Sequence, residues 1–242
     1  MNTNNSVLCV IPARYASTRL EGKPLLEIKG KPLVMWSYEQ ALCSQAFEKV
    51  CIATDHGRIY EVAKSWGADV VMTRTDHPSG TDRVYEVVEK TDLKYVVNLQ
   101  GDEPQIPHEL LRMISKNVQS LDDNSLLTCI SNATIEEAMN PNVVKAVLQK
   151  DMNALYFSRA MIPYNRDGTG NMFLKHHGIY GFSRGSIARF CSLPPGKLER
   201  IEKLEQLRAL EGGMRIRCIR YDFNSIGIDT PEDLESFRRQ VG

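Results

Sequence analysis

Short apolar runs alternate with amphipathic stretches along the first half of the chain. Apolar runs rich in β-branched residues are typical of buried strands, and apolar positions near a 3.6-residue period are typical of helices. The pattern predicts strands at 7–11, 49–53, 68–72, 95–99 and 126–130, and helices at 32–46, 58–66, 81–90 and 107–121. Pro12 is expected to end the first strand because proline lacks an N–H for the ladder.

The alternation of strand and helix at short spacing predicts right-handed crossovers and a parallel sheet. From about residue 141 to 195 the alternation is lost, and apolar runs at 143–148, 154–157 and 178–182 surround a polar loop. We therefore expect an α/β fold, with a mostly parallel twisted sheet flanked by helices and a mixed insertion near 141–195. The whole chain, 1–242, is expected to form one domain, in which 141–195 is a subdomain on the sheet.

The remainder of the chain predicts a helix at 199–211, strands at 216–221 and 225–229, and a last helix. Gly212 and Gly213 end the first of these helices. Thr230 and Asp233 form a capping pair that opens the last one.

Charge and cysteine usage narrow the class of protein. The 242 residues carry 30 basic and 30 acidic side chains, which argues against non-specific binding of nucleic acid and against a polybasic membrane surface. The six cysteines are scattered and no C-x-x-C occurs, which is typical of a reducing compartment. No signal-peptide pattern is found, and no apolar run approaches the roughly 18 residues of a membrane span. The chain is expected to be cytoplasmic.

The loop after the first strand is the first candidate for chemistry. It combines small residues with three cations: Ala13, Ala16, Ser17, Thr18 and Gly22, with Arg14, Arg19 and Lys23. Small residues let a polyanion approach backbone N–H groups, and the cations can neutralise it. The loop matches neither the P-loop nor G-x-G-x-x-G. We interpret it as a binding loop for a nucleoside triphosphate; a solvated basic loop is the alternative.

Two carboxylates follow predicted strands, at the edge where parallel sheets bind ligands. Asp102 comes after the strand at 95–99, where Gly101 is expected to allow a sharp turn, and Asp229 ends the strand at 225–229. Two carboxylates near a triphosphate favour a Mg²⁺ ion, which binds one or two carboxylates together with phosphate oxygens and water. The alternative for Asp102 is a turn residue. Asp229 has no obvious structural task, because Thr230 and Asp233 already cap the last helix.

Several motifs in order make the chain similar to a known family. They are IPARYASTRLEGKP (11–24), ATD (53–55), TRTDHPSGTDR (73–83), NLQGDEP (98–104), ALYFSRAMIP (154–163), HGIYGF (177–182), EKLEQLRAL (202–210) and GIDTPEDL (227–234). Together they resemble the motifs of 3-deoxy-manno-octulosonate cytidylyltransferases, the CMP-Kdo synthetases, over nearly the whole chain. The resemblance implies the Rossmann-like nucleotide-diphospho-sugar transferase fold. It also implies transfer of a cytidylyl group from CTP to Kdo, giving CMP-Kdo and pyrophosphate for lipopolysaccharide synthesis, by a Mg²⁺-dependent homodimer. The subdomain 141–195 would then serve sugar binding and dimerisation.

The resemblance also implies the roles of particular residues. CTP would be bound by Ala13, Arg14, Lys23, Arg74, Ser79, Gly80 and Gln100, with Ser79 and Gly80 reading the cytosine largely through backbone groups. The sugar would be bound by Gln100, Arg159, His176, Tyr180, Glu202 and Gln206. Mg²⁺ would be held by Asp102 and Asp229. Arg14, Lys23 and Asp102 would be the catalytic residues.

Some of the predicted sugar-binding residues also have a purely structural interpretation. Glu202 and Gln206 are four apart on one face of the predicted helix, and such faces are usually only solvated. Tyr180 could be plain packing. His176 and His177 are adjacent, and neighbouring residues on a strand point to opposite faces. The chain departs from the family pattern at Glu21, where proline is common, and at His177, where an apolar residue is common.

Other functions are carried as alternatives. One is a cytidylyltransferase for a different acidic sugar, either a sialic acid or 8-amino-Kdo; the first loop lacks the glycines and lysines typical of the sialic acid enzymes. Another is a sugar-1-phosphate nucleotidyltransferase, whose glycine-rich first loop is also missing. The last is a nucleotide-binding module without turnover, but binding alone would not require the two carboxylates that follow the predicted strands.

Overall fold

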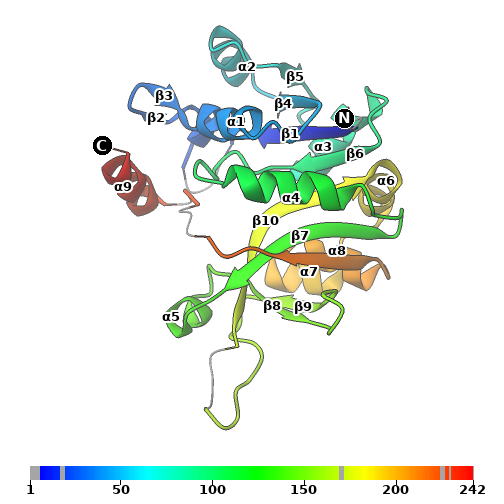
Figure 1. Cartoon of the computed structure of the whole chain (residues 1–242). Helices are drawn as coiled ribbons and strands as arrows, with labels where there is room; N and C mark the ends of the chain where they lie inside the picture. Colours follow the sequence, from blue (N-terminus) through cyan, green and yellow to red (C-terminus); the bar gives the residue numbers. More distant parts are fainter. Residues whose placement is uncertain (1–5, 17–19, 169–171, 224–226, 229, 242) are drawn as a thin grey trace. The chain divides into compact units, whose positions relative to one another are not determined.

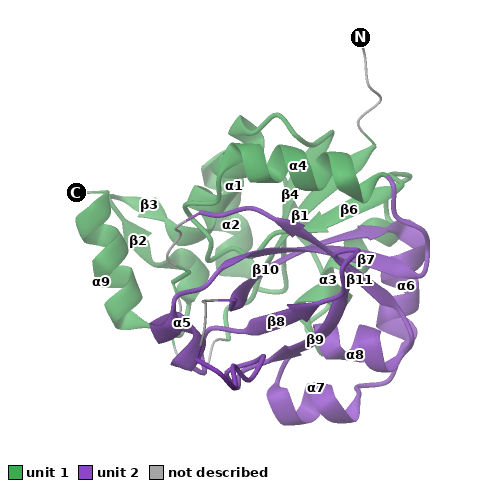
Figure 2. Cartoon of the chain, turned by 60° about the horizontal axis from the view of Figure 1, so that its bottom comes forward, with its two compact units in different colours: residues 1–119, 224–242 green, residues 120–223 purple. Residues whose placement is uncertain are grey.

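The computed structural model describes residues 6–16, 20–168, 172–223, 227–228 and 230–241. The chain divides into two compact units, coloured separately in Figure 2. Unit 1 comprises residues 1–119 and 224–242, and unit 2 comprises residues 120–223. The insertion predicted at 141–195 lies inside unit 2. That the chain acts as one domain stays a prediction.

Unit 1 contains a parallel sheet in the order β6-β1-β4-β5. The strands are β1 (Val7–Ala13), β4 (Lys49–Thr54), β5 (Val70–Met72) and β6 (Tyr95–Asn98), and every pair among them is parallel (Figure 1). The apolar run at the start of β1 is fully buried, as a strand covered on both faces requires. The predicted parallel sheet is confirmed here.

Four helices pack on this sheet: α1 (Leu33–Cys43), α2 (Gly57–Ser65), α3 (Gly80–Glu89) and α4 (His108–Val118). α1 and α4 contact each other, and α3 packs against β1, β4 and β6 (Figure 1). Ile11 and Val34 of α1 both lie next to Gly101, whereas Pro12 lies next to Gly80 of α3. Because successive strand residues point to opposite faces, α1 and α3 cover opposite faces of β1.

The C-terminal helix α9 (Pro231–Gln240) belongs to the same unit. Its Phe237 packs in one apolar cluster with Leu33 and with Ile28 of the small hairpin β2 (Glu27–Ile28) and β3 (Lys31–Pro32). The predicted capping pair is confirmed, because Thr230 accepts a hydrogen bond from the Asp233 N–H and the Asp233 side chain accepts one from the Thr230 N–H.

Unit 2 contains a mixed sheet in the order β11-β7-β10, continued by β8 and β9. These strands are β7 (Ser125–Asn132), β8 (Lys145–Leu148), β9 (Ala154–Ser158), β10 (Leu174–Ser183) and β11 (Arg215–Arg220). β11 runs parallel to β7, and the pairs β7–β10, β10–β8 and β8–β9 are antiparallel. The predicted mixed character of the 141–195 region is confirmed.

Four short helices belong to unit 2: α5 (Ile135–Met139), α6 (Arg184–Ser192), α7 (Lys197–Glu202) and α8 (Gln206–Glu211). The apolar pattern did not predict α5 or α6. Both begin at side-chain caps, Thr134 and Ser183, which accept hydrogen bonds from backbone N–H groups three residues on.

The structure corrects the predicted helix at 199–211. The chain forms α7 and α8 instead, because Lys203 adopts a left-handed conformation with φ 55° and ends α7. Glu202 and Gln206 therefore stand on different helices and not on one face of a single helix.

Two predicted boundaries in unit 1 are also wrong. Pro12 does not end β1, which continues to Ala13; β6 pairs with β1 only as far as Val10, so the missing N–H of Pro12 removes no bond on that side. The cap of α3 is Ser79 and not Thr81, because Thr81 is buried inside the helix and its Oγ1 accepts a hydrogen bond from Asn98.

Within the described residues, no helix is both long and apolar enough to cross a membrane. All six cysteines lie in described positions, and none forms a disulfide. The predicted strand at 225–229 lies largely outside the described residues.

Candidate active site

In unit 1, the end of β1 is the point at which the predicted nucleotide residues meet. A Cβ added to Gly80 would lie 3.6 Å from Pro12 Cγ, and one added to Gly101 would lie 3.3 Å from Ile11 Cγ2. A side chain at position 101 would therefore fit only tightly against β1. Its φ is not positive, so the sharp turn expected there is not the reason for the glycine.

The first loop contributes a lysine that is paired with a predicted metal ligand. Lys23 begins a short 3-10 turn, η1 (Lys23–Leu25), and its Nζ lies 2.5 Å from Asp102 Oδ2. The Lys23 side chain is 13% exposed and that of Asp102 is 31% exposed. Because this ion pair is partly exposed to solvent, Lys23 can bind a phosphate and Asp102 a metal ion in place of each other. The charges of both side chains then remain balanced.

Arg14 joins the first loop to the segment 73–83. Its Nη2 donates a hydrogen bond of 3.2 Å to the backbone carbonyl of His77. Ser79, two residues further on, caps α3 by accepting from the Asp82 N–H at 3.2 Å, and its own hydroxyl donates to Asp82 Oδ2 at 2.5 Å. Arg14, Ser79 and Gly80 are thus brought together at one place in unit 1.

A buried arginine holds the segment that carries Arg74. Arg83 is fully buried; its Nη2 lies 2.6 Å from Asp55 Oδ2, and its Nη1 donates to the Arg74 carbonyl at 3.2 Å. The Arg74 side chain itself is 69% exposed, with carboxylates of Asp76 and Glu86 no closer than 3.7 Å. Arg74 is therefore exposed and only loosely paired.

Glu86 fixes the same segment from α3. It accepts from the Arg74 N–H at 3.0 Å, lies 2.5 Å from His77 Nε2 and pairs with Lys90 at 2.7 Å. Burial raises the pKa of Glu86, but hydrogen bonds from Lys90, from the Arg74 N–H and from His77 outweigh burial and lower the pKa to about 2. Sequence reasoning missed both Arg83 and Glu86, because nothing in a short motif distinguishes a buried charge from a solvated one.

Three predicted unit 1 residues remain to be placed. Gln100 is half-buried and lies two residues after the end of β6. Arg19 and Asp229 lie outside the described residues. Ile228, which precedes Asp229 in the sequence, donates its N–H to the Asp102 carbonyl at 3.0 Å.

The carboxylate of Asp102 is the kind of oxygen ligand that a hard divalent cation such as Mg²⁺ prefers. Among the described residues, no group of three His, Cys, Asp or Glu side chains could hold a metal ion. Mg²⁺ does not require such a cage, since one or two carboxylates suffice when phosphate oxygens and water complete its shell. The partly exposed carboxylate of Asp102 meets that requirement.

In unit 2, Glu202 ties the end of α7 to the end of β9. Its carboxylate accepts from Ser158 Oγ at 2.6 Å and from the Arg159 N–H at 2.9 Å. Arg159 in turn donates from Nε to the Glu202 carbonyl at 2.8 Å and from Nη1 to the Pro141 carbonyl at 3.0 Å. Arg159 and Glu202 are thus brought together, and Glu202 orients Arg159.

Lys145 is a second anchor for Arg159, and the sequence did not single it out. Its side chain is fully buried, and Nζ donates to the carbonyls of Asn140, Val143 and Arg159 at 2.9, 2.6 and 2.7 Å. Burial and the nearby Arg159 guanidinium lower the pKa of Lys145.

Tyr180, His176 and Gln206 form a compact polar cluster. The Tyr180 hydroxyl donates to Gln206 Oε1 at 3.1 Å, and the His176 ring centroid lies 5.5 Å from that of Tyr180. Tyr180 and Gln206 are buried, and the Gln206 amide nitrogen has no hydrogen-bond partner among the described residues. Burial raises the pKa of Tyr180 well above its usual range, so its hydroxyl stays a donor.

His176 is held neutral. Its Nε2 lies 2.8 Å from Thr128 Oγ1, whose hydroxyl donates to the Ile179 carbonyl, so Nε2–H is the donor to Thr128. Burial, followed by the neighbouring His177, lowers the pKa of His176 to about 3. His177 contacts Ser131 and Phe223 instead, which confirms that the two histidines point to opposite faces of β10.

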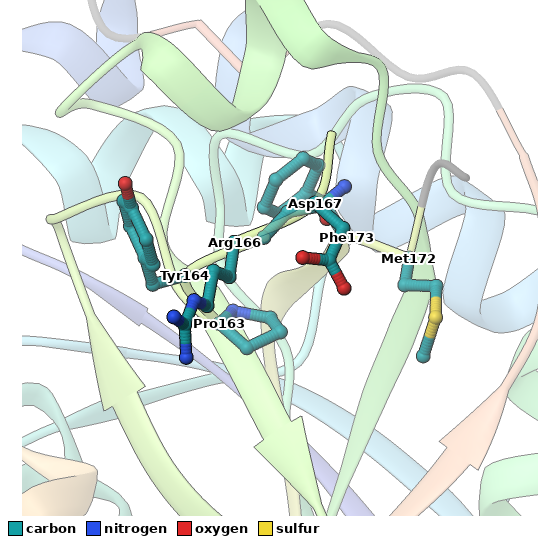
Figure 3. A pocket seen from close by; sticks show the side chains of 7 residues that line it. Pro163, Tyr164, Arg166, Asp167, Met172 and Phe173 are labelled. Carbon is teal, nitrogen blue, oxygen red and sulfur yellow. The ribbon is translucent and has the colours of Figure 1, made fainter. Parts of the chain in front are cut away.

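A pocket of unit 2 contains none of the predicted site residues. It is lined by Pro163, Tyr164, Asn165, Arg166, Asp167, Met172 and Phe173 (Figure 3). All of these belong to the loop between β9 and β10, so this pocket shares no residue with the clusters described above.

The fold and the unit 1 geometry define a class of protein, the nucleotidyltransferases of the nucleotide-sugar type, in which a parallel sheet presents a cationic first loop and a carboxylate. The chain belongs to the cytidylyltransferase family, whose model matches residues 8–216. It is also similar to a solved structure of a CMP:2-keto-3-deoxy-manno-octonic acid synthetase complexed with CTP. The identity is 39%, the alignment covers 97% of this chain and 98% of the other, and the TM-score is 0.92.

More distant structures share the fold alone. A cytidylyltransferase from Leptospira borgpetersenii serovar Hardjo-bovis is 19% identical over 96% of this chain and 85% of its own, with a TM-score of 0.62. A Bacillus anthracis protein described as a glucose-1-phosphate thymidylyltransferase, in complex with sucrose, is 12% identical over 97% of this chain and 94% of its own, with a TM-score of 0.68.

Proposed function

We propose that this enzyme transfers a cytidylyl group from CTP to the anomeric hydroxyl of 3-deoxy-D-manno-octulosonate (Kdo), giving CMP-Kdo and pyrophosphate. The observation that carries the proposal is the 39% identity, over nearly both full chains, to a synthetase of this kind complexed with CTP. The product is the activated sugar from which Kdo enters lipopolysaccharide.

CTP is assigned to unit 1. Arg14 and Lys23 bind the phosphates, next to the backbone of Ala13. Ser79 and Gly80 bind the cytosine. Arg74 and Gln100 are the remaining CTP-binding residues. What supports this assignment is the convergence of the first loop and the start of α3 on Pro12. A base edge read by backbone groups at a helix start costs no side-chain entropy.

Kdo is assigned to the residues of unit 2. Arg159 binds the carboxylate of the sugar. His176 is neutral and donates its one N–H to Thr128, so its Nδ1 is proposed to accept a hydrogen bond from a sugar hydroxyl. Tyr180 and Gln206 bind hydroxyls. The unpartnered amide nitrogen of Gln206 supports this, because a buried donor without a partner costs free energy unless a ligand satisfies it. Glu202 acts through its hold on Arg159.

In the reaction, the anomeric hydroxyl oxygen of Kdo forms a bond to the α-phosphorus of CTP and its proton is released to water, while the bond from that phosphorus to the pyrophosphate oxygen breaks in line. Catalysis of this kind rests on positioning and on charge neutralisation. Lys23 and Arg14 stabilise the charge that develops on the departing pyrophosphate. We assign no side chain as a general base.

Mg²⁺ is proposed as the cofactor, held by Asp102 and Asp229. When bound, it neutralises phosphate charge and lowers the pKa of a coordinated hydroxyl. We further propose that the enzyme acts in the cytoplasm, as a homodimer, without nucleic-acid or membrane partners.

Pyrophosphate release with CTP and Mg²⁺ tests the proposal. The acceptor panel consists of Kdo, 8-amino-Kdo, a sialic acid and a hexose-1-phosphate, with EDTA as the control for the metal. Turnover with Kdo alone is expected. A clear preference for 8-amino-Kdo would keep the mechanism and change the sugar, and binding of CTP without turnover on any acceptor would contradict the proposed enzyme.

A further inference from the structure

Tyr15 lies in the first loop, between Arg14 and the undescribed positions 17–19, and the proposed function gives it no task. Its ring stacks on the imidazole of His56, with centroids 4.0 Å apart and an interplanar angle of 15°. Its hydroxyl accepts a hydrogen bond of 3.0 Å from Arg58 Nη1. The loop is thereby attached to the start of α2, because His56 is the N-cap residue of that helix.

The same tyrosine holds the far end of the loop. The Gly22 N–H donates to the Tyr15 carbonyl at 3.0 Å, which closes the loop on itself. Gly22 has a φ of +64°, and a Cβ there would lie 3.4 Å from the Tyr15 ring. Both the backbone and the ring of Tyr15 therefore contact the residue that directly precedes Lys23.

We propose that Tyr15 is a positioning residue that clamps the first loop between His56 and Gly22, and so sets Arg14 and Lys23 for the β- and γ-phosphates of CTP. The inference rests on the proposed function. We call Tyr15, Gly22, His56 and Arg58 the Tyr15 clamp. Its side chains are not part of the hydrophobic core, because Tyr15 and His56 are only half-buried and Arg58 is exposed. β1 and β4 remain packed by their own buried residues. Loss of the ring is therefore expected to move the loop without unfolding unit 1.

Nucleotide binding to Tyr15→Leu and Tyr15→Phe, measured by titration calorimetry, tests the clamp. CTP carries the β- and γ-phosphates and CMP does not, so CMP is the matched ligand control. Tyr15→Leu is expected to weaken CTP binding by about tenfold, the scale of a misplaced positioning group, and to leave CMP binding unchanged. Tyr15→Phe keeps the stacked ring and is expected to bind CTP nearly as the wild type does.

A second route to the same clamp guards against effects peculiar to one variant. His56→Ala removes the stack from the other side and is expected to weaken CTP binding to a similar degree. Because both changes break one contact, the double variant Tyr15→Leu/His56→Ala should bind CTP no more weakly than either single variant. Trp66→Leu, at a 44% exposed aromatic residue of unit 1 outside the clamp, is the control for the loss of an aromatic ring.

The outcomes separate the clamp from the proposed function. Equal CTP affinity in Tyr15→Leu and wild type would overturn the clamp, and so would parallel loss of CTP and CMP binding together with a lowered melting temperature. If the wild type failed to prefer CTP over CMP, the assignment of the first loop to phosphates would itself fail, and with it the proposed function of unit 1.

Discussion

At the residue scale, Asp102 carries the greatest consequence. Its carboxylate contacts Lys23 at 2.5 Å while it remains partly exposed, so it can serve both a cation of the protein and one from solution. Asp102→Asn keeps the shape and a hydrogen-bond acceptor but removes the charge. We expect turnover in the pyrophosphate assay to fall by about 10²-fold or more, the scale of losing a preorganised electrostatic group.

The control for Asp102→Asn is Asp92→Asn, at an exposed position of the same unit. It removes one negative charge without touching the site, so turnover should not change. Near wild-type turnover of Asp102→Asn at saturating magnesium would contradict the assignment of Asp102 as a metal ligand.

The two histidines of β10 predict how stability depends on pH. Burial lowers the pKa of His176 to about 3 and that of His177 to about 4; for His177, Lys175 lowers the pKa further, while Glu137 and Asp222 oppose the shift. The unfolded chain binds protons on these residues below about pH 6.5, whereas the folded chain does not. Their contribution to stability is therefore complete above that pH and is lost as the pH falls.

Urea unfolding at pH 7.5 and pH 5.5 measures this effect. The free energy of unfolding should decrease by at most about 1.4 kcal/mol per pH unit for each histidine that stays neutral. The free energy of unfolding of His177→Asn should decrease less with falling pH than that of the wild type. Equal stability of the wild type at the two pH values would show that the histidines titrate normally in the folded state.

At the element scale, the break between α7 and α8 is the main departure from the sequence pattern. The helical pattern runs through residues 199–211, but Lys203 turns the chain into a left-handed conformation. Arg208 then reaches back across the break to Glu199 at 2.6 Å. The break turns Glu202 toward β9 and Gln206 toward Tyr180, so one predicted helix face becomes two separate contacts.

Glu202→Ala tests the link between α7 and β9. The change leaves Ser158 Oγ and the Arg159 N–H without an acceptor, so we expect a loss of about 1–3 kcal/mol in the free energy of unfolding. The KM for Kdo should rise and the KM for CTP should not, because Arg159 is assigned to the sugar. Glu136→Ala, at an exposed position of α5, is the matched control. A rise in both KM values would contradict a role confined to the sugar.

At the scale of the whole molecule, the proposed homodimer is the property to test. The region predicted to mediate it, 141–195, exposes large apolar side chains, among them Leu155 at 54%, Tyr164 at 87% and Met172 at 75%. Tyr164 and Met172 line the same pocket, and exposed apolar side chains that lie next to one another are typical of surfaces that another chain covers. We expect the 27.4 kDa chain to sediment as a dimer.

Charge placed on this region should shift the equilibrium toward monomer. Met172→Glu is the test variant, and Met72→Glu, at a 44% exposed methionine of unit 1, is the control for an added carboxylate. Dissociation of both variants, or of neither, would show that the apolar side chains of 141–195 do not form the interface.

Local information in the sequence determined much of this protein. Buried strands follow from short apolar β-branched runs, and the cap of α9 follows from Thr230 and Asp233, which are close together in the chain. The cationic first loop and Asp102 were also visible, because both follow strands of a parallel sheet, and such strands end at one edge. Asp229 and Arg19 were predicted as well, and they stay predictions.

Only the tertiary structure decided which of these residues touch. Lys23 and Asp102 are 79 positions apart, and their pairing depends on how β1 and β6 lie side by side. The burial of Arg83 and Lys145, the break at Lys203 and the stack of Tyr15 on His56 likewise depend on neighbours that are distant in sequence. Local propensity cannot supply these features, because long-range packing overrides it at the positions where two elements meet.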